Sequence, residues 1–182
     1  NLREVRNVKT PADLKGVKLR MPGSKEWLFL GEALGATATP LAFGEVYLGL
    51  KTGTIDGQDN PLPSVRAAKF YEVTKQIVMT NHLVDGIFIA IADKAWKAMT
   101  PAQRQKVQAA ANDAAAFNNK NRLEEEAQIV DFFKKEGLTV TTPDVEAFRK
   151  SVQAAYATSD MAKTWPAGML DGGVLEGPGA GP

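Results

Sequence analysis

Cysteine is absent from the 182-residue sequence, and histidine occurs only once, as His82. The lack of cysteine excludes disulfides, thiolate nucleophiles and cysteine-ligated metals, although it leaves the cellular compartment open. A serine–histidine–aspartate triad would have to use His82, and a metal site with several histidine ligands is impossible. No run of about 18 apolar residues occurs, so the sequence predicts no membrane-spanning helix.

An excess of charge of either sign is also absent. Lys and Arg total 22 against 21 Asp and Glu, which gives a formal net charge of +1. This balance argues against broad electrostatic binding of nucleic acid. The motifs of phosphate loops, dinucleotide folds, zinc proteases, serine hydrolases and EF-hands are missing as well. An enzyme is therefore the least favoured class, and we expect no cofactor, no metal and no nucleic-acid partner.

The two ends of the sequence are unusual. It starts at Asn1, without an initiator methionine or the apolar stretch of a signal peptide, so we expect a processed, truncated or engineered piece. Residues 171–182 include five glycines and two prolines. Such a composition does not pack a core, and it predicts a flexible tail.

Helical and strand patterns alternate at short intervals in the first half, which is typical of an α/β fold. The patterns predict strands at 17–21, 37–43, 54–58, 76–80 and 86–92, and helices at 25–34, 44–51 and 64–71. In the first strand, Val17, Leu19 and Met21 share one face, and Lys18 and Arg20 the other.

Three helix starts share one pattern. Thr10, Thr100 and Thr142 each stand before a proline, which places threonine at the N-cap and proline at the first helical position. Gln103 completes a capping box with Thr100. Gly16 is expected to end the short first helix in a left-handed conformation.

No glycine or proline interrupts residues 102–136 after Pro101. As one helix this stretch would be roughly 50 Å long. Its apolar positions do not keep to one helical face, however, and a polar segment at 118–121 separates them. Two helices, or one long helix that bends near Asn118, are both compatible with the pattern. A strand at 138–140 and a helical region at 143–164 follow.

Two polar side chains lie at predicted strand ends. Arg20 is near the C-terminal end of its strand, the edge at which open α/β sheets bind ligands. Arginine there can grip a carboxylate through two parallel hydrogen bonds, although a solvated or salt-bridged side chain is more usual. Asn60 follows another strand and ordinarily forms a turn. Phe43 and Trp27 are ordinarily core residues.

Three further side chains have a chemical and a structural interpretation. Asp56 and Asp59 form a close carboxylate pair, which is suited to acid–base work or to holding a cation, but the ordinary interpretation is a turn around Gly57. His82, between two strands, is more often a structural residue than a catalyst.

Several stretches, in their order and spacing, strongly resemble the DctP-type solute receptors of TRAP (tripartite ATP-independent periplasmic) transporters. The stretches are Leu14–Pro22, Leu41–Tyr47, Asp56–Leu62, Lys69–Val73, Thr80–His82 and, after a long helix, Phe132–Gly137. The resemblance runs from about Thr10 to about Leu170.

The resemblance implies a periplasmic-binding-protein-like fold of two α/β lobes around a cleft, with a parallel or mixed sheet and a long inter-lobe helix. Residues 1–85 would form the core of the ligand-binding lobe, and residues 86–127 would form part of the other lobe. Residues 128–170 would return to the ligand-binding lobe and supply its C-terminal helices. The family captures small organic acids in the periplasm, closes over them by a hinge motion and delivers them to membrane permease subunits.

The resemblance also implies the site residues. Arg20 would form the salt bridge to the ligand carboxylate, Asn60 would orient that carboxylate, and Phe43 would line the pocket. Ser24 falls at a pocket position of variable small residues, and Trp27 is a further pocket candidate. The expected ligand is a sugar acid or a C4-type acid.

The sequence departs from the family in two ways. It matches only the C-terminal part, roughly three-fifths, of the family's length, and its glycine-rich end replaces a charged final helix. The complete receptor is expected to be a monomer, whereas this chain could associate through uncovered apolar surface. A truncated or engineered fragment that is structural only, without ligand binding, is therefore the alternative function.

Overall fold

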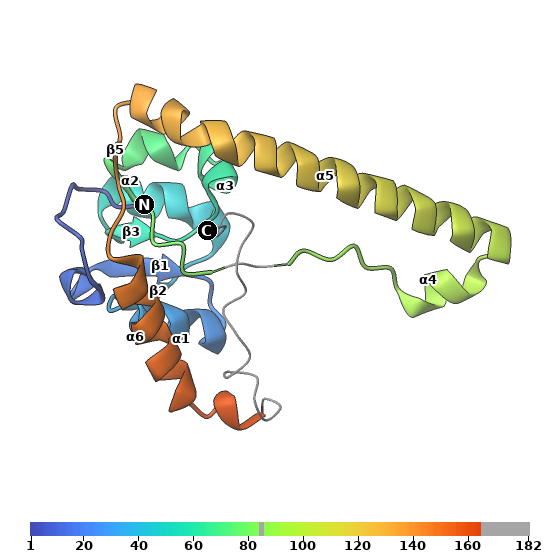
Figure 1. Ribbon diagram of the computed structural model, residues 1–182, viewed down its shortest axis with the longest axis horizontal. Helices are drawn as coiled ribbons and strands as arrows, with labels where there is room; N and C mark the ends of the chain where they lie inside the picture. The colour runs from blue at the N-terminus through green and yellow to red at the C-terminus, as the bar shows by residue number, and fades with distance from the viewer. Residues whose placement is uncertain (84–85, 165–182) are drawn as a thin grey trace, which may run out of the picture.

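The structure is a computed structural model that describes residues 1–83 and 86–164. These residues form a body of helices around short parallel strands, and an arm that projects from the body (Figure 1). The tail expected at 171–182 lies outside the described residues.

The central strand of the body is β1 (Lys18–Met21), which pairs in parallel with β2 (Thr37–Pro40) and β3 (Gly57–Gln58). A second parallel pair is formed by β4 (Gln76–Val78) and β5 (Thr139–Thr141). Leu2 makes antiparallel bridges to Gly57 and to Gln76, so it joins the two sheets. The expected parallel or mixed sheet in an α/β fold is confirmed, although β3 is shorter than the strand predicted at 54–58.

Gly57 allows this junction to form. A Cβ atom at this position would lie 2.7 Å from the backbone oxygen of Asn1 and 2.8 Å from the side chain of Leu2. Both separations are shorter than van der Waals contact, so any larger residue would push the first residues away from β3.

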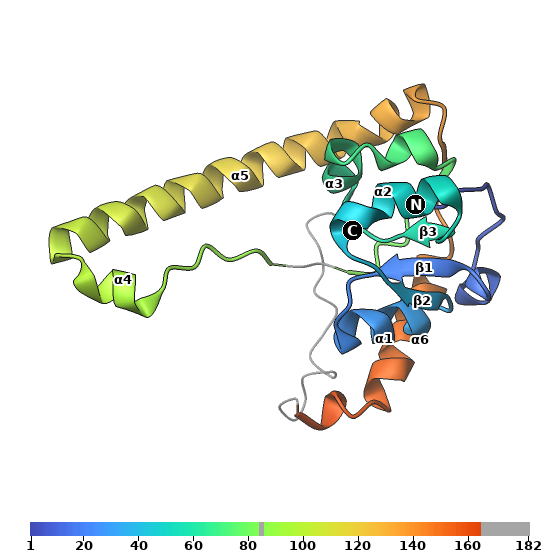
Figure 2. The same ribbon diagram turned by 180° about the vertical axis from the view of Figure 1, so that it is seen from behind.

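Helices cover both faces of the strands. On one side lie α1 (Lys25–Ala33) and α6 (Val145–Ala157), and on the other lie α2 (Val46–Thr52), α3 (Leu62–Ala67) and the end of α5 (Pro101–Lys135), as Figures 1 and 2 show from opposite directions. Single 3-10 turns occupy Pro11–Leu14, Phe43–Glu45, Phe70–Val73 and Ala162–Thr164.

The two coverings produce two apolar cores. The first includes Val17, Leu19, Met21, Leu30, Leu34 and Phe148. The second includes Val46, Leu50, Ile55, Val65, Ile77, Ile129 and Phe133. The three apolar residues that the alternating pattern placed on one face of the first strand all enter the first core, as predicted.

The helix starts follow the predicted caps with one exception. Thr100 and Gln103 form the capping box, and Gly16 has the left-handed φ of 78°. The prediction that Thr142 caps the last helix is wrong, because α6 begins later, at Val145. Its cap is Asp144, whose carboxylate accepts the backbone N–H of Ala147 at 3.0 Å, while the backbone N–H of Asp144 donates to Lys9.

Between the two alternatives for residues 101–136, the structure has one continuous helix, α5, of 35 residues. Its C-terminal part packs on the body through Ile129 and Phe133, and its N-terminal part leads outward to α4 (Asp93–Ala98), a helix that the sequence analysis did not predict. We call residues 86–120 the arm. Within 1–83 and 86–164, no helix combines the length and apolar character needed to cross a bilayer.

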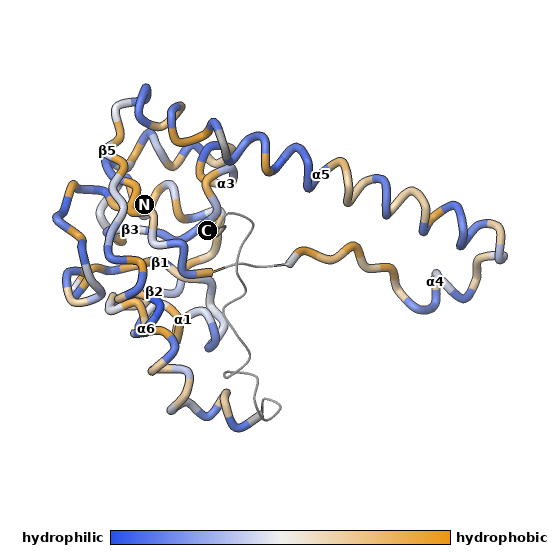
Figure 3. The backbone as a smooth tube through the Cα atoms, in the orientation of Figure 1, coloured by the Kyte–Doolittle hydropathy of each residue, from blue (hydrophilic) through white to orange (hydrophobic). Residues whose placement is uncertain are grey.

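The strand predicted at 86–92 is wrong for this chain, because the segment pairs with no strand of the described residues. A strand needs a neighbour for its backbone hydrogen bonds, and this segment runs along the arm away from both sheets (Figure 2). Its side chains are largely in solvent, with Ile87 89% and Phe88 88% exposed. Figure 3 shows the segment as a continuous hydrophobic stretch before α4.

Two leucines on α2 test the second core. Leu50 is fully buried and Leu48 is 61% exposed. We expect Leu50→Ala to lower the free energy of unfolding by about 2–5 kcal/mol, because it removes buried methyl groups and leaves a cavity. Leu48→Ala, the matched control, should change it by less than about 0.5 kcal/mol. Urea unfolding measures both, and equal effects would contradict this account of the core.

The uncovered segment 86–92 generates a second prediction. Because an apolar, uncharged stretch with unpaired backbone groups is a template for pairing, we expect the chain to associate as its concentration rises. Ile89→Lys should shift it towards the monomer, whereas Leu48→Lys, on the body, should not. Sedimentation velocity over a concentration series measures this, and a monomer at every concentration would be the contrary result.

Candidate functional site

The candidate site lies at the carboxyl edge of the three-stranded sheet. In the parallel register, Arg20 on β1 is opposite Thr39 on β2 and Gln58 on β3. The chain leaves these strands toward Ser24, Phe43 and Asn60 respectively. The strand ends therefore place the predicted residues at one edge, where open α/β sheets bind ligands.

Arg20 is the charged residue of this edge. Its side chain is only 4% exposed, and its Nε donates to the backbone oxygen of Leu41 at 2.8 Å. The guanidinium carbon lies 6.0 Å from the ring centre of Phe43. Burial lowers the pKa of Arg20, and the negative charge of Asp59 opposes that shift.

No carboxylate of the described residues lies within ion-pair distance of the Arg20 guanidinium. The salt-bridged form of the more usual interpretation therefore fails across the described chain. An arginine keeps its charge at every ordinary pH, so this edge carries a positive group with unused donors.

Asn60 is held by the side chain of Gln58. The Asn60 Nδ2 donates to Gln58 Oε1 at 2.6 Å, and Gln58 Nε2 donates to Asn1 Oδ1 at 2.8 Å. Gln58 is 1% exposed. The amino group of Asn1 donates to the backbone oxygen of Gln58 at 2.8 Å, and burial lowers its pKa to about 6 against the opposing charge of Asp59.

A second polar link joins the end of β3 to the residues after β4. His82 Nε2 lies 3.3 Å from Asp59 Oδ2, and His82 Nδ1 lies 2.6 Å from Thr80 Oγ1. Both ring nitrogens of His82 therefore have partners, as its structural interpretation expects. Burial alone would raise the pKa of Asp59, but its interactions with His82, the Asn1 amino group and Arg20 outweigh burial and lower it.

Asp56 and Asp59 do not form a pair. Asp56 Oδ2 accepts the backbone N–H of Lys18 at 2.9 Å, at the start of β1, whereas Asp59 lies beyond the end of β3. The expected turn that caps its own backbone is also wrong for Asp56, which bonds a neighbouring strand. Across the described chain, His, Asp and Glu side chains nowhere gather in a group of three that would hold a metal ion.

A cavity of about 50 Å³ lies beneath this edge. Its polar lining comes from the ends of β3 and β4 and from the first residue, and its apolar lining from the first core. The lining residues are Asn1, Leu2, Leu14, Leu19, Leu34, Gln58, Asp59, Val78, Thr80 and His82.

Ser24 and Trp27 stand apart from this network. Ser24 caps α1 by accepting the backbone N–H of Trp27 at 3.4 Å, and Trp27 packs against the first core. No described hydrogen bond, ion pair or ring contact joins either of them to Arg20 or Asn60. The structure thus brings Arg20 together with Phe43, and it bonds Asn60 to Gln58, the residue opposite Arg20 in the register.

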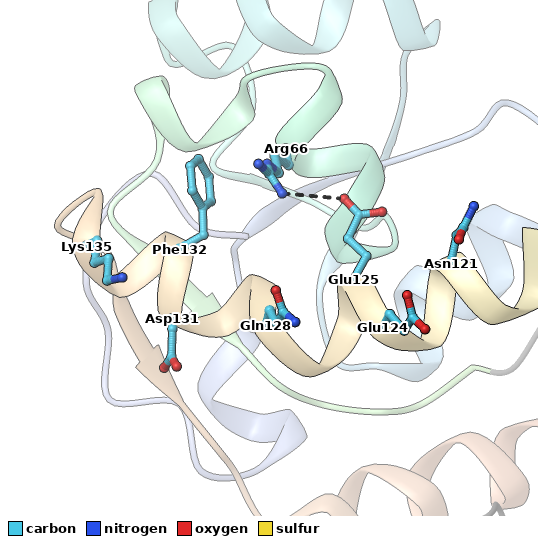
Figure 4. A pocket seen from close by; sticks show the side chains of 8 residues that line it. All are labelled: Arg66, Asn121, Glu124, Glu125, Gln128, Asp131, Phe132 and Lys135. Atoms are coloured by element: carbon cyan, nitrogen blue, oxygen red, sulfur yellow. Dashed lines mark ion pairs between the residues drawn. The ribbon is translucent and has the colours of Figure 1, made fainter.

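A larger groove, of about 630 Å³, lies between α3 and α5 and contains none of the predicted site residues (Figure 4). Arg66 on α3 lies over the ring of Phe132, 4.6 Å from its centre, and pairs with Glu125 at 3.8 Å. Because the Arg66 guanidinium already contacts Phe132 and Glu125, both on α5, we interpret the groove as the contact surface that holds α5 on the body.

The sequence analysis missed Gln58 and the link between Asp59 and His82. Asp59 and His82 each stood out alone, but no local pattern joins residues 23 positions apart. The sequence did not mark Gln58 as a site residue, since a single uncharged polar side chain in a short strand fits the ordinary alternation of polar and apolar residues.

Solved structures define the class to which this fold belongs. The chain is similar to a TRAP periplasmic solute-binding protein of Roseobacter denitrificans with bound 3-deoxy-D-manno-oct-2-ulosonic acid, at 49% identity and a TM-score of 0.91. The match covers 94% of this chain and 57% of that one. A second protein of that organism, with bound L-galactonate, matches at 34% identity and a TM-score of 0.79 over 85% of this chain and 51% of its own.

The model of the bacterial extracellular solute-binding protein family 7 matches residues 2–163. The chain belongs to this family, the DctP receptors, which confirms the resemblance drawn from the motifs. Its functionally named relatives are described as solute-binding or periplasmic ligand-binding proteins.

Two curated relatives with more than 30% identity carry ligand names, and a third, the C4-dicarboxylate-binding periplasmic protein of Shewanella loihica, is 29% identical over 140 residues. The sialic acid-binding periplasmic protein of Vibrio cholerae is 40% identical over 148 residues, which are 81% of this chain and 46% of the relative. The 2,3-diketo-L-gulonate-binding periplasmic protein of Escherichia coli is 37% identical over 142 residues, 78% and 43% respectively. The chain thus spans just under half the length of these two relatives.

The Asp59 link makes stability depend on pH. The pKa of Asp59 is below its ordinary 3.8 in the folded protein, so its contribution is present above that value and is lost as the pH falls through the folded pKa. We expect the free energy of unfolding of Asp59→Asn to fall less steeply than that of the unaltered chain below about pH 4. Urea unfolding from pH 6 to pH 3 measures this.

Asp93→Asn is the control for this experiment, because that carboxylate is 73% exposed on α4. It should leave the pH slope unchanged. Equal slopes for Asp59→Asn and the unaltered chain would contradict the proposed contribution of the Asp59 carboxylate.

Proposed function

We propose that the chain forms the carboxylate-anchoring part of a periplasmic TRAP receptor for a sugar acid. The observation that carries this proposal is the buried Arg20, which has no carboxylate partner in the described chain. A ligand carboxylate would accept two hydrogen bonds from the guanidinium. The attraction between the charges strengthens when water leaves the site.

The other predicted residues complete the anchor. Asn60 offers an N–H to the same carboxylate, and Phe43, 49% exposed beside Arg20, forms an apolar wall. Ser24 and Trp27, at the start of α1, would contribute only to the outer rim. Sialic acid, 3-deoxy-D-manno-oct-2-ulosonic acid and L-galactonate are named for relatives that are 34–49% identical, and each combines a carboxylate with several hydroxyls. The C4-dicarboxylate-binding relative is 29% identical. The comparison therefore supports a sugar acid over a C4 dicarboxylate.

We propose that residues 86–127 belong to a second lobe of the receptor, and that the ligand is enclosed between the lobes. Two features support this proposal: the arm projects from the body, and its segment 86–92 is apolar and uncovered. A periplasmic location and delivery to a TRAP permease belong to the same proposal, and the names of the relatives, which are periplasmic and TRAP solute-binding proteins, support it.

The small cavity supports the alternative for this chain taken alone. A volume of about 50 Å³ is well below the roughly 300–1,000 Å³ of ordinary ligand pockets. Without further walls the anchor lies on an open edge. A chain that folds but binds no acid would be a structural fragment of a receptor.

Thermal unfolding with a panel of acids separates the two functions. With L-galactonate or 3-deoxy-D-manno-oct-2-ulosonic acid at 100 times its dissociation constant, binding should stabilise the chain by about 2.7 kcal/mol and raise its Tm by roughly 5–10 °C. Arg20→Ala should lower the affinity at least tenfold, because the carboxylate loses its charge partner.

Arg149→Ala is the matched control, since Arg149 is paired with Glu146 on α6, outside the candidate site. It should leave the affinity unchanged. Unchanged affinity in Arg20→Ala would refute the anchor, and a cooperative melt that no acid shifts would favour the structural fragment.

A further inference from the structure

Gln58 is a buried polar residue at the centre of the anchor, and the family comparisons give it no role. It lies on β3 directly opposite Arg20, and its side chain is 1% exposed. A buried amide costs free energy when its oxygen or nitrogen lacks a hydrogen-bond partner. Here the two partners are Asn60 on one side and Asn1 on the other, at 2.6 Å and 2.8 Å.

These two bonds fix how Asn60 is turned. An amide nitrogen carries two hydrogens in one plane, and its oxygen carries none. When one Asn60 N–H donates to Gln58 Oε1, the second N–H takes a set direction. Without that acceptor the Asn60 amide is free to rotate, and half a turn would present its oxygen in place of its N–H.

The orientation matters because a carboxylate accepts hydrogen bonds and does not donate them. An Asn60 oxygen turned toward a carboxylate would repel it, whereas an N–H would bind it. The Gln58 side chain is itself held, since its Nε2 donates to Asn1 Oδ1 at 2.8 Å, and the Asn1 amino group holds the Gln58 backbone by donating to its oxygen at 2.8 Å.

From this geometry we propose that Gln58 is a positioning residue for the ligand carboxylate: its buried side chain holds the Asn60 amide with an N–H turned to the anion. The inference rests on the proposed function, in which Asn60 and Arg20 share one carboxylate. The new element is that Gln58 determines which atom of the Asn60 amide faces the ligand. Gln58 therefore acts through Asn60 and does not contact the ligand itself.

The first test needs no ligand. In nuclear magnetic resonance spectra of the unaltered chain, one side-chain amide proton of Asn60 should exchange slowly with solvent, because it is bonded to Gln58. Gln58→Met keeps the length of the side chain and removes the acceptor, so this protection should disappear. Protection that persists in Gln58→Met, or that is absent from the unaltered chain, would overturn the proposal.

The second test is a double-mutant cycle read by calorimetry with L-galactonate. We expect Gln58→Met to weaken binding about three- to tenfold, the value of one immobilised side chain. In the Asn60→Ala background the same change should have no further effect. Equal losses in both backgrounds would show that Gln58 acts independently of Asn60, against the proposal.

Gln153→Met, an exposed position on α6, is the matched control and should leave the affinity unchanged. If Gln58→Met does not fold, slow exchange of the Asn60 amide proton in the unaltered chain remains the test, and fast exchange there would overturn the proposal. Failure of the proposed function has a different signature: the unaltered chain binds no acid, or Asn60→Ala binds as tightly as the unaltered chain, while the Asn60 protection is present. Either result would remove ligand positioning and leave Gln58 a purely structural clamp.

Discussion

A positive charge inside a protein requires either water or a negative partner, and this requirement organises the candidate site. Arg20 is nearly excluded from solvent, yet its only direct polar bond in the described chain is to the neutral backbone oxygen of Leu41. Asp59 supplies a negative field without an ion pair. The fold therefore tolerates a charge that it does not neutralise, which is the condition for an anion to bind there strongly.

That condition depends on the joint between the two sheets. Leu2 bridges Gly57 and Gln76, and the absence of a side chain at Gly57 lets the first residues approach β3 closely. As a result, the ends of β3 and β4 face one another across Asn1. Gln58, Asp59 and His82 are thereby brought to the same edge as Arg20, although they come from different segments.

The sequence predicted those features that are governed by local chemistry. The capping box at Thr100, the left-handed Gly16 and the alternating faces of the first strand depend on residues a few positions apart. The place of Arg20 at the end of β1 followed from the same alternation, and its proposed role came from the family resemblance.

Features governed by distant partners could not be predicted in this way. The segment 86–92 has the composition of a strand, but strand formation requires a neighbour that the described chain lacks. The bonds of Asn60 to Gln58 and of His82 to Asp59 depend on how strand ends meet. Proline and the capping residues predicted where the helices start, yet α6 begins at Val145 with Asp144 as its cap, three residues after the end of β5.

The continuity of α5 gives the molecule a mechanical lever. The helix is anchored at Ile129 and Phe133, and its 35 residues end far from that anchor at Pro101. At 1.5 Å per residue, the distance from Ile129 to Pro101 is roughly 42 Å, so a rotation of about 5° at the anchor would displace the tip by about 4 Å. A change smaller than a bond length among the side chains around Phe133 would thus be amplified into a displacement comparable to the spacing between neighbouring strands.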